Sequence, residues 1–195
     1  GLKNFIDIAD YITVNISSPN TEGLRDFHDQ AKLNDLLAAL NKIKKDKKTD
    51  IPLLLKISPD IHENHISEIV DVILKNSISA IVLTNTTNSN KDNLKDKAKN
   101  ESGGLSGEPL QQISTNMIKK FYKLLNGKIP IIGVGGVNSG KSAYEKIIAG
   151  ASLLQLYTGF VYRGPSTAKE IKKELIQILK DEGIKNIKDV VGKGS

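Results

Sequence analysis

Residues 129–159 read IPIIGVGGVNSGKSAYEKIIAGASLLQLYTG, and this stretch decides the fold. It opens with an almost continuously apolar run, Ile129 to Val134, and closes with a second, Leu153 to Tyr157. Short runs of this kind are typical of strands buried on both faces. A glycine-rich turn and a helix beginning near Ser139 to Ser142 lie between them. The stretch therefore predicts two parallel strands joined by a helix.

The same alternation extends towards the amino terminus. Three earlier apolar runs predict strands at Tyr11 to Ile16, Leu53 to Ile57 and Ala80 to Thr84. Amphipathic helices follow from apolar residues that share one helical face: Leu33, Leu36, Leu37, Leu40 and Ile43; Ile66, Ile69, Val70, Ile73 and Leu74; Ile113, Met117, Phe121, Leu124 and Leu125; and Ile171, Leu175, Ile178 and Leu179, with Gly183 ending the last helix. Five strands, each followed by a helix, predict a parallel α/β architecture.

One polar segment interrupts this pattern. Residues 88–100 contain a single large apolar residue, Leu94, among lysines, aspartates and asparagines. The segment predicts a long mobile loop after the third strand. Such a loop is either a tolerated surface insertion or a lid over a site.

Composition limits the class of protein. A chain of 195 residues with 38% hydrophobic residues forms one ordinary domain with a core. The absence of cysteine excludes disulfides, thiolate metal sites and a cysteine nucleophile. No apolar run approaches the roughly 20 residues of a membrane span, which predicts a soluble segment. The net charge of +6 is nearly all lysine, with Arg25 and Arg163 as the only arginines. This favours a solvated basic surface over nucleic-acid binding and leaves a membrane-surface role open.

Unusual polar or glycine-rich clusters follow every predicted strand. These clusters are residues 15–21, Lys56, residues 84–87, residues 133–136 and residues 157–159. Ligands bind at the carboxyl ends of parallel strands, so the clusters are expected to converge on one site. Asn15 and Asn20 offer amide groups to a planar polar ligand, and Ser18 offers a hydroxyl that can exchange a proton. Taken singly, each cluster also fits a turn or a helix cap.

The glycine cluster supports two kinds of phosphate site. Residues 135–142 satisfy the P-loop pattern G-x-x-x-x-G-K-[ST]. Two observations disfavour a nucleotide triphosphatase: no later strand ends in an aspartate for magnesium, and Ser142 to Glu145 predict a capping box that occupies the Ser142 hydroxyl. The alternative is a phosphate bound by the backbone N–H groups of Gly135 and Gly136, near a helix N-terminus and the loop containing Thr158.

The three histidines predict no metal centre. His62 and His65 have a spacing that suits a metal, but no third ligand is evident, and His28 stands alone. No metal site is expected.

Six motifs together resemble the dihydroorotate dehydrogenase family. They are Asn-Ile-Ser-Ser-Pro-Asn-Thr (15–21), Lys-Ile-Ser-Pro-Asp (56–60), Thr-Asn-Thr-Thr (84–87), Gly-Gly-Leu-Ser-Gly-Glu-Pro-Leu (103–110), Ile-Ile-Gly-Val-Gly-Gly-Val (131–137) and Gly-Ala-Ser-Leu-Leu-Gln-Leu-Tyr-Thr-Gly (150–159). The chain is most similar to class 2, the quinone-linked form, because Ser18 stands where class 1 enzymes carry a cysteine base.

This resemblance implies a fold and a domain organisation. It implies a TIM (β/α)8 barrel that holds FMN, of which residues 1–195 form a single incomplete domain with strands four to eight. The first three strands and the amino-terminal quinone-binding helices have no counterpart here, so the chain alone is expected to be inactive. The full-length enzyme is expected at the bacterial cytoplasmic membrane or the mitochondrial inner membrane, attached peripherally, with no nucleic-acid partner.

The resemblance also implies residue roles. It assigns FMN binding to Asn15, Lys56, Thr84, Gly107, Gly135, Tyr157 and Thr158. It assigns dihydroorotate binding to Asn15, Asn20, Asn85 and Thr86. Ser18 would remove the C5 proton while a hydride leaves C6 for the flavin, giving orotate for pyrimidine (UMP) synthesis, and quinone would take up the electrons. Thr21 or a water would begin a proton relay from Ser18.

Two other functions remain open. One is another FMN barrel oxidoreductase such as a dihydrouridine synthase, in which a cysteine acid would be expected. The other is a noncatalytic half-barrel that binds FMN or phosphate.

Overall fold

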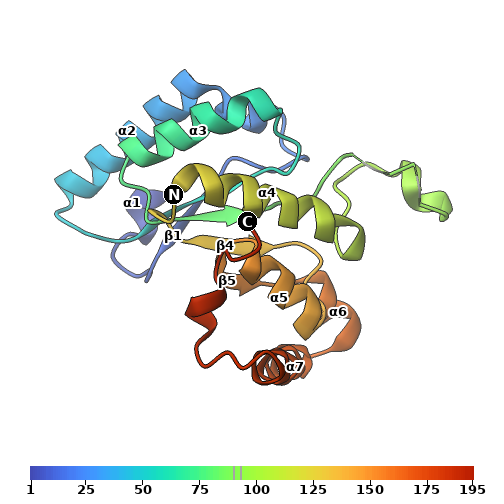
Figure 1. Ribbon diagram of the computed structural model, residues 1–195. Coiled ribbons are helices and arrows are strands. Elements are labelled where there is room, and N and C mark those ends of the chain that lie inside the picture. Colours follow the sequence, from blue (N-terminus) through green and yellow to red (C-terminus); the bar gives the residue numbers. More distant parts are fainter. Residues whose placement is uncertain (90, 93) are drawn as a thin grey trace.

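A computed structural model describes residues 1–89, 91–92 and 94–195 (Figure 1). Its centre is one parallel five-stranded sheet in the order β1-β2-β3-β4-β5. The strands are β1 (Ile12–Asn15), β2 (Leu53–Ile57), β3 (Ala80–Leu83), β4 (Ile131–Val134) and β5 (Ala151–Gln155). Because all five strands are parallel and neighbours in the chain are neighbours in the sheet, their carboxyl ends lie along one edge. The predicted α/β alternation is confirmed.

The helices pack on the sheet in the same order as the strands. They are α1 (Leu2–Phe5), α2 (Gln30–Asp46), α3 (Glu63–Lys75), α4 (Gln111–Leu125), α5 (Gly140–Ile148), α6 (Thr158–Arg163) and α7 (Thr167–Asp181), with short 3-10 helices η1 (Leu24–His28), η2 (Lys97–Asn100), η3 (Glu108–Leu110) and η4 (Ile187–Val190). Helix α2 packs on α3, α3 on α4, α4 on α5, and α5 on α7. This arrangement is visible in Figure 1.

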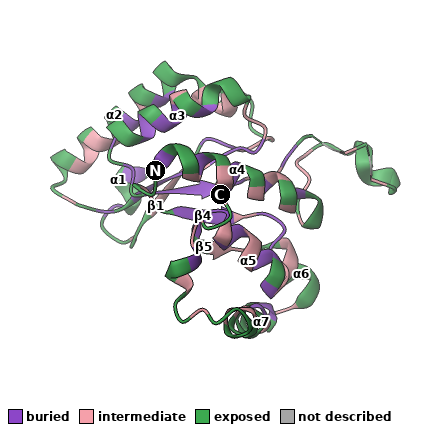
Figure 2. Ribbon diagram, in the orientation of Figure 1, coloured by how far each residue is buried: buried purple, intermediate pink, exposed green. Residues whose placement is uncertain are grey.

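Two of the three hydrophobic clusters of the described residues flank the sheet, and the third joins Val137, Ala143 and Ile171 beside α5 and α7. The large one fills the space between sheet and helices, and its fully buried members include Leu33, Ile69 and Phe121. The small one lies on the opposite face, where Leu54, Ala80, Val82 and Ile132 pack on one another. Buried residues therefore follow the strands and the inner helix faces (Figure 2).

The burial of the outer strands differs from the prediction. Strand β5 begins two residues before the predicted Leu153, and the Leu153 side chain is 63% exposed. It belongs to none of the hydrophobic clusters of the described residues, so this face of β5 is not covered. Leu74 and Leu124 are also exposed although they were predicted on buried faces, while Val72 and Ile118 are buried instead.

Helices α2, α3 and α4 end close to left-handed residues. Lys48, Ser77 and Asn126 have φ of 52°, 51° and 49°. Each lies in the loop that leads into the next strand, β2, β3 or β4. These loops run along the amino-end edge of the sheet, opposite the strand ends with the polar clusters.

The polar segment after β3 is closed at its base. The backbones of Thr87 and Leu105 form an antiparallel bridge with N–H···O distances of 3.1 and 2.7 Å. Between them, Lys91 Nζ donates to the carbonyl oxygens of Glu101 (3.1 Å) and Gly103 (2.6 Å). Figure 1 shows the segment reaching away from the sheet, with η2 near its tip. Asn90 and Asn93 of the predicted loop lie outside the described residues, and its mobility stays a prediction.

None of the described helices is both long and apolar enough to cross a bilayer.

Candidate functional site

A cavity of about 200 Å³ lies at the carboxyl ends of β2 to β5. It brings together predicted site residues from four different strand ends: Lys56, Thr84, Asn85, Thr86, Gly107, Gly135, Tyr157 and Thr158. Its remaining lining residues are Ser106, Leu110, Val134, Gly136, Val137, Leu156 and Gly159. A neighbouring cavity of about 570 Å³ shares Gly107, Gly136 and Thr158 with the first and extends to Asn138 and Arg163.

Gly135 and Gly136 form the tightest turn of this site. Their φ values are 119° and 72°. A Cβ atom on Gly136 would lie 2.7 Å from Gln111 Cα, and one on Gly135 would lie 3.0 Å from the Leu110 side chain. The turn therefore packs directly on the start of α4, and only glycine fits there. Backbone N–H groups in such a turn can approach an anion closely.

The N-cap of α5 is a different serine from the predicted one. Ser139, not Ser142, is the N-cap, and the capping box joins these two serines. The Ser142 hydroxyl accepts the N–H groups of Asn138 and Ser139, both at 3.0 Å. The predicted consequence holds, since this hydroxyl is occupied by the helix start, and Lys141 is exposed. Neither residue points to a nucleotide triphosphatase.

The loop after β5 forms another wall of the cavity. Thr158 is the first residue of α6, a helix that the sequence analysis missed, and its hydroxyl donates to Ser106 Oγ at 3.0 Å. Tyr157 lines the cavity although its side chain is 80% exposed. The wall of the cavity that this loop forms is therefore polar and largely exposed.

The end of β3 is held by both of its neighbours. The buried Thr84 donates its N–H to the carbonyl of Val134 (3.0 Å), and Asn85 donates its N–H to the carbonyl of Ile57 (3.1 Å). The Asn85 side-chain oxygen accepts the N–H of Thr86 at 2.7 Å. These contacts fix the Asn85 amide at the cavity wall.

Ser17 connects Asn85 to the first strand, a role that the sequence analysis missed. Asn85 Nδ2 donates to Ser17 Oγ at 3.0 Å, and Ser17 Oγ donates to Asn15 Oδ1 at 2.6 Å. Ser17 is fully buried. Asn15 itself does not line the cavity but is linked to it through this hydrogen-bonded chain.

Ser18 and Asn20 lie on the loop beyond β1 and do not line the cavity either. Ser18 Oγ accepts the N–H of Asn20 (3.2 Å) and the hydroxyl of Thr21 (3.3 Å). Ser18 and Thr21 are thus in contact, and the proton relay between them stays a prediction. Asn20 lines a separate cavity of about 510 Å³ with Pro19, Asn88, Lys91, Ser102 and Gly103.

Lys56 is the cation of the main cavity. It is half-buried at the end of β2, and burial lowers the pKa of its ammonium. No carboxylate of the described residues forms an ion pair with it. Lys56 is therefore free to stabilise negative charge on a ligand.

Asp60, four residues after Lys56, forms hydrogen bonds with residues of the neighbouring loops. Its carboxylate accepts from Arg25 (3.1 Å), from the N–H of Asn88 (2.9 Å) and from the hydroxyl of Thr87. Nothing in the sequence predicts this role of Asp60, because its donors come from distant segments.

The histidines lie away from the cavity. Burial, followed by the nearby Arg25, lowers the pKa of His28 to about 4, so it is neutral near pH 7. His65 Nδ1 lies 3.0 Å from Glu68 Oε2. Among the described residues, no three His, Cys, Asp or Glu side chains group as metal ligands would.

Comparison with known proteins gives consistent matches. The family model described as "Dihydroorotate dehydrogenase" matches residues 1–179. The mitochondrial dihydroorotate dehydrogenase (quinone) of Arabidopsis thaliana is 43% identical over 98% of this chain and 43% of that protein. The Bartonella tribocorum dihydroorotate dehydrogenase (quinone) is 44% identical over 97% of this chain and 54% of that protein. The chain thus spans about half the length of these curated relatives.

The solved structures agree. A ligand-free DHODH from Eimeria tenella superposes with a TM-score of 0.93 at 36% identity, covering 99% of this chain and 58% of the other. The same organism's DHODH in complex with ferulenol gives a TM-score of 0.92 at 36% identity.

Proposed function

Because the chain belongs to the dihydroorotate dehydrogenase family, we propose that it forms the FMN-binding and substrate-binding part of a quinone-dependent dihydroorotate dehydrogenase. In this proposal the complete enzyme oxidises (S)-dihydroorotate to orotate for pyrimidine synthesis. The five strands serve as strands four to eight of a (β/α)8 barrel. Electrons pass to quinone, as the names of the curated relatives suggest, and the complete enzyme attaches peripherally to a bacterial cytoplasmic or mitochondrial inner membrane.

The observation that carries the proposal is the convergence of Lys56, Thr84, Gly107, Gly135 and Thr158 on one cavity. These residues fit the chemistry of FMN. The tight Gly135–Gly136 turn suits a phosphate, because backbone N–H groups of residues without side chains can approach an anion closely. Lys56 suits the electron-rich edge of the flavin ring, because its ammonium has no protein counter-charge in the described chain. Tyr157 and Thr158 border the cavity beside the glycine turn and complete the FMN-binding set, together with Asn15.

FMN, when bound, supplies the acceptor for the hydride. The chain's own residues bind the substrate and move the proton. We assign the polar edges of dihydroorotate to Asn15, Asn20, Asn85 and Thr86, since amides present the donors and acceptors that a pyrimidine and a carboxylate require.

Ser18 takes the C5 proton in this proposal. A serine hydroxyl is a weak base, so it needs surroundings that favour loss of its own proton. The N–H of Asn20 and the hydroxyl of Thr21 both donate to Ser18 Oγ. Two donors stabilise negative charge on this oxygen and thereby favour its deprotonation. In this proposal the Thr21 hydroxyl, 3.3 Å from Ser18 Oγ, also begins the proton relay.

The test uses the full-length protein that contains this chain. Purified protein should show a flavin absorbance band near about 450 nm and should release FMN, not riboflavin, on denaturation. It should reduce a quinone only when dihydroorotate is supplied. Bound FMN without dihydroorotate oxidation would favour the noncatalytic binding function, and absence of any flavin would refute the proposal.

A further inference from the structure

Lys146 is a buried cation behind the glycine turn. It lies on α5, is 0% exposed, and directs its ammonium at the start of α4. There Nζ donates to Thr115 Oγ1 (3.0 Å), Ser114 Oγ (3.1 Å) and the carbonyl of Gln111 (3.3 Å). All three acceptors are neutral. No described carboxylate pairs with Lys146.

Two of the three acceptors of Lys146, Ser114 and Gln111, belong to residues that contact the glycine turn. The Ser114 hydroxyl donates onward to the carbonyl of Val134, the residue before Gly135. A Cβ atom on Gly135 would lie 3.1 Å from Ser114 Cβ, and one on Gly136 would lie 2.7 Å from Gln111 Cα. Only one layer of side chains therefore separates the ammonium from the turn that borders the cavity.

A cation buried among neutral oxygens is costly without a nearby negative charge. Burial lowers the pKa of Lys146 to about 8, and its neighbour Glu145 opposes this shift. Glu145, its neighbour in the chain, is the charged group that acts on Lys146, and it accepts a hydrogen bond from Gln111 Nε2 at 2.6 Å. The groups that the ammonium contacts, Ser114, Thr115 and the Gln111 carbonyl, are neutral. An anion at the Gly135–Gly136 turn would add a second negative charge near the ammonium.

We propose that Lys146 is a positioning residue for the flavin phosphate: its ammonium holds the start of α4 against the Gly135–Gly136 turn, and its charge favours a dianionic phosphate there. The inference rests on the proposed function and adds a residue that does not line the cavity. A lysine that merely joined α4 to α5 would stabilise the fold without favouring phosphorylated over unphosphorylated flavin.

The test compares FMN with riboflavin, which lacks the phosphate. Flavin-free full-length protein is titrated with each flavin by fluorescence quenching. For Lys146→Met we expect FMN affinity to fall by about 10-fold or more, and riboflavin affinity to change by less than about 3-fold, as for loss of a charge-assisted interaction. Lys146→Arg should keep part of the FMN preference. Lys141→Met, on the exposed face of the same helix, should keep all of it.

The wild-type protein offers an independent measurement if Lys146→Met does not fold. The FMN-to-riboflavin affinity ratio should fall as the pH rises from about 7 to about 9.5, because the ammonium loses its proton in that range while the phosphate stays dianionic. A ratio that stays constant with pH, or that is equal in wild type and a folded Lys146→Met, would overturn the inference. Failure of wild type to bind either flavin would instead refute the proposed function, and this inference with it.

Discussion

The guanidinium of Arg25 lies 3.1 Å from the carboxylate of Asp60, and this ion pair joins the loop after β1 to the loop after β2. The same carboxylate accepts the N–H of Asn88 and the hydroxyl of Thr87, at the base of the polar segment after β3. One largely buried carboxylate thus ties together three loops, including the loop that carries Ser18.

Asp60→Asn should lower the free energy of unfolding by about 1–3 kcal/mol, because it leaves the half-buried Arg25 without its counter-charge. Urea denaturation measures this change. The matched control is Asp26→Asn, since Asp26 is exposed and its pair with Lys32 spans 3.5 Å; it should cost less than about 0.5 kcal/mol. Equal effects of the two variants would show that Asp60 is not an anchor.

Ser18→Ala should leave FMN bound and should slow flavin reduction by dihydroorotate by at least about 100-fold, the lower end expected for loss of a general base. Ser18→Cys should retain part of the rate and shift the pH dependence downward, because a thiol has a reference pKa of about 8.5. Anaerobic stopped-flow of the two half-reactions measures both. Reoxidation by quinone is the internal control. If Ser18→Ala reduces its flavin at the wild-type rate, Ser18 is not the base.

Thr21→Val should slow the same half-reaction by about 2-fold to 10-fold, because it removes one neutral hydrogen bond from Ser18 Oγ. The effect should be smaller than that of Ser18→Ala. Thr21→Ser keeps the hydroxyl and should retain most of the rate. If Thr21→Val and Thr21→Ser reduce the rate equally, the hydroxyl contributes nothing.

Gly135→Asp should abolish flavin retention, since the new side chain would meet Leu110 and Ser114 and would repel a phosphate. Flavin content per protein is read from the absorbance spectrum. Gly127→Asp is the control: Gly127 also has a positive φ, 70°, but a Cβ there meets nothing within 4 Å. Normal flavin content in Gly135→Asp would place the phosphate elsewhere.

Lys146 should also make the stability of the flavin-free protein depend on pH. Its pKa is about 8 in the folded state against 10.5 for the ordinary side chain. Between these values the unfolded chain binds more protons, so the free energy of unfolding rises with pH, by on the order of 1–3 kcal/mol. Lys146→Met should lack this rise in urea denaturation series. Parallel pH profiles for the two proteins would contradict the prediction.

The sequence predicted the features that depend on strand ends. Strand β2 has its predicted bounds, and Lys56, Thr84 and Gly135 meet at one cavity because parallel strands in chain order align their carboxyl ends. That conclusion needs only the topology. It does not need the path of any loop.

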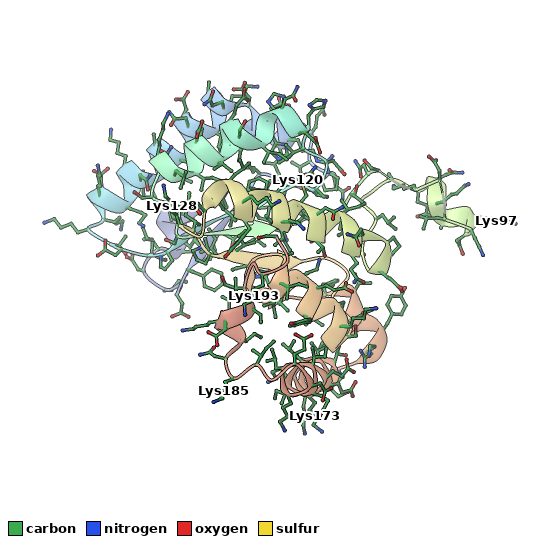
Figure 3. All side chains as sticks on the ribbon, viewed as in Figure 1. Lys97, Lys120, Lys128, Lys173, Lys185 and Lys193 are labelled. Carbon is green, nitrogen blue, oxygen red and sulfur yellow. The ribbon has the colours of Figure 1, made fainter. Side chains whose placement is uncertain are left out.

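Features that depend on tertiary neighbours were missed. Nothing in the local sequence distinguishes the buried Lys146 from the exposed Lys141. Both are lysines on the short helix α5, and only the position of α4 buries one of them. Many of the chain's other lysines extend outward, including the labelled Lys97, Lys120, Lys128, Lys173, Lys185 and Lys193 (Figure 3). Helix α6 is six residues long, too short to show a helical period.

The left-handed residues at the ends of α2 and α3 have a consequence for adaptation to temperature. Lys48 and Ser77 hold φ near 50° without being glycine, which costs roughly 1 kcal/mol each. Both lie at the amino-end edge of the sheet, away from the cavity. Relief of this strain would raise the melting temperature without touching the binding residues. Thermal tolerance and the lining of the cavity can therefore evolve, or be engineered, independently at opposite edges of one sheet.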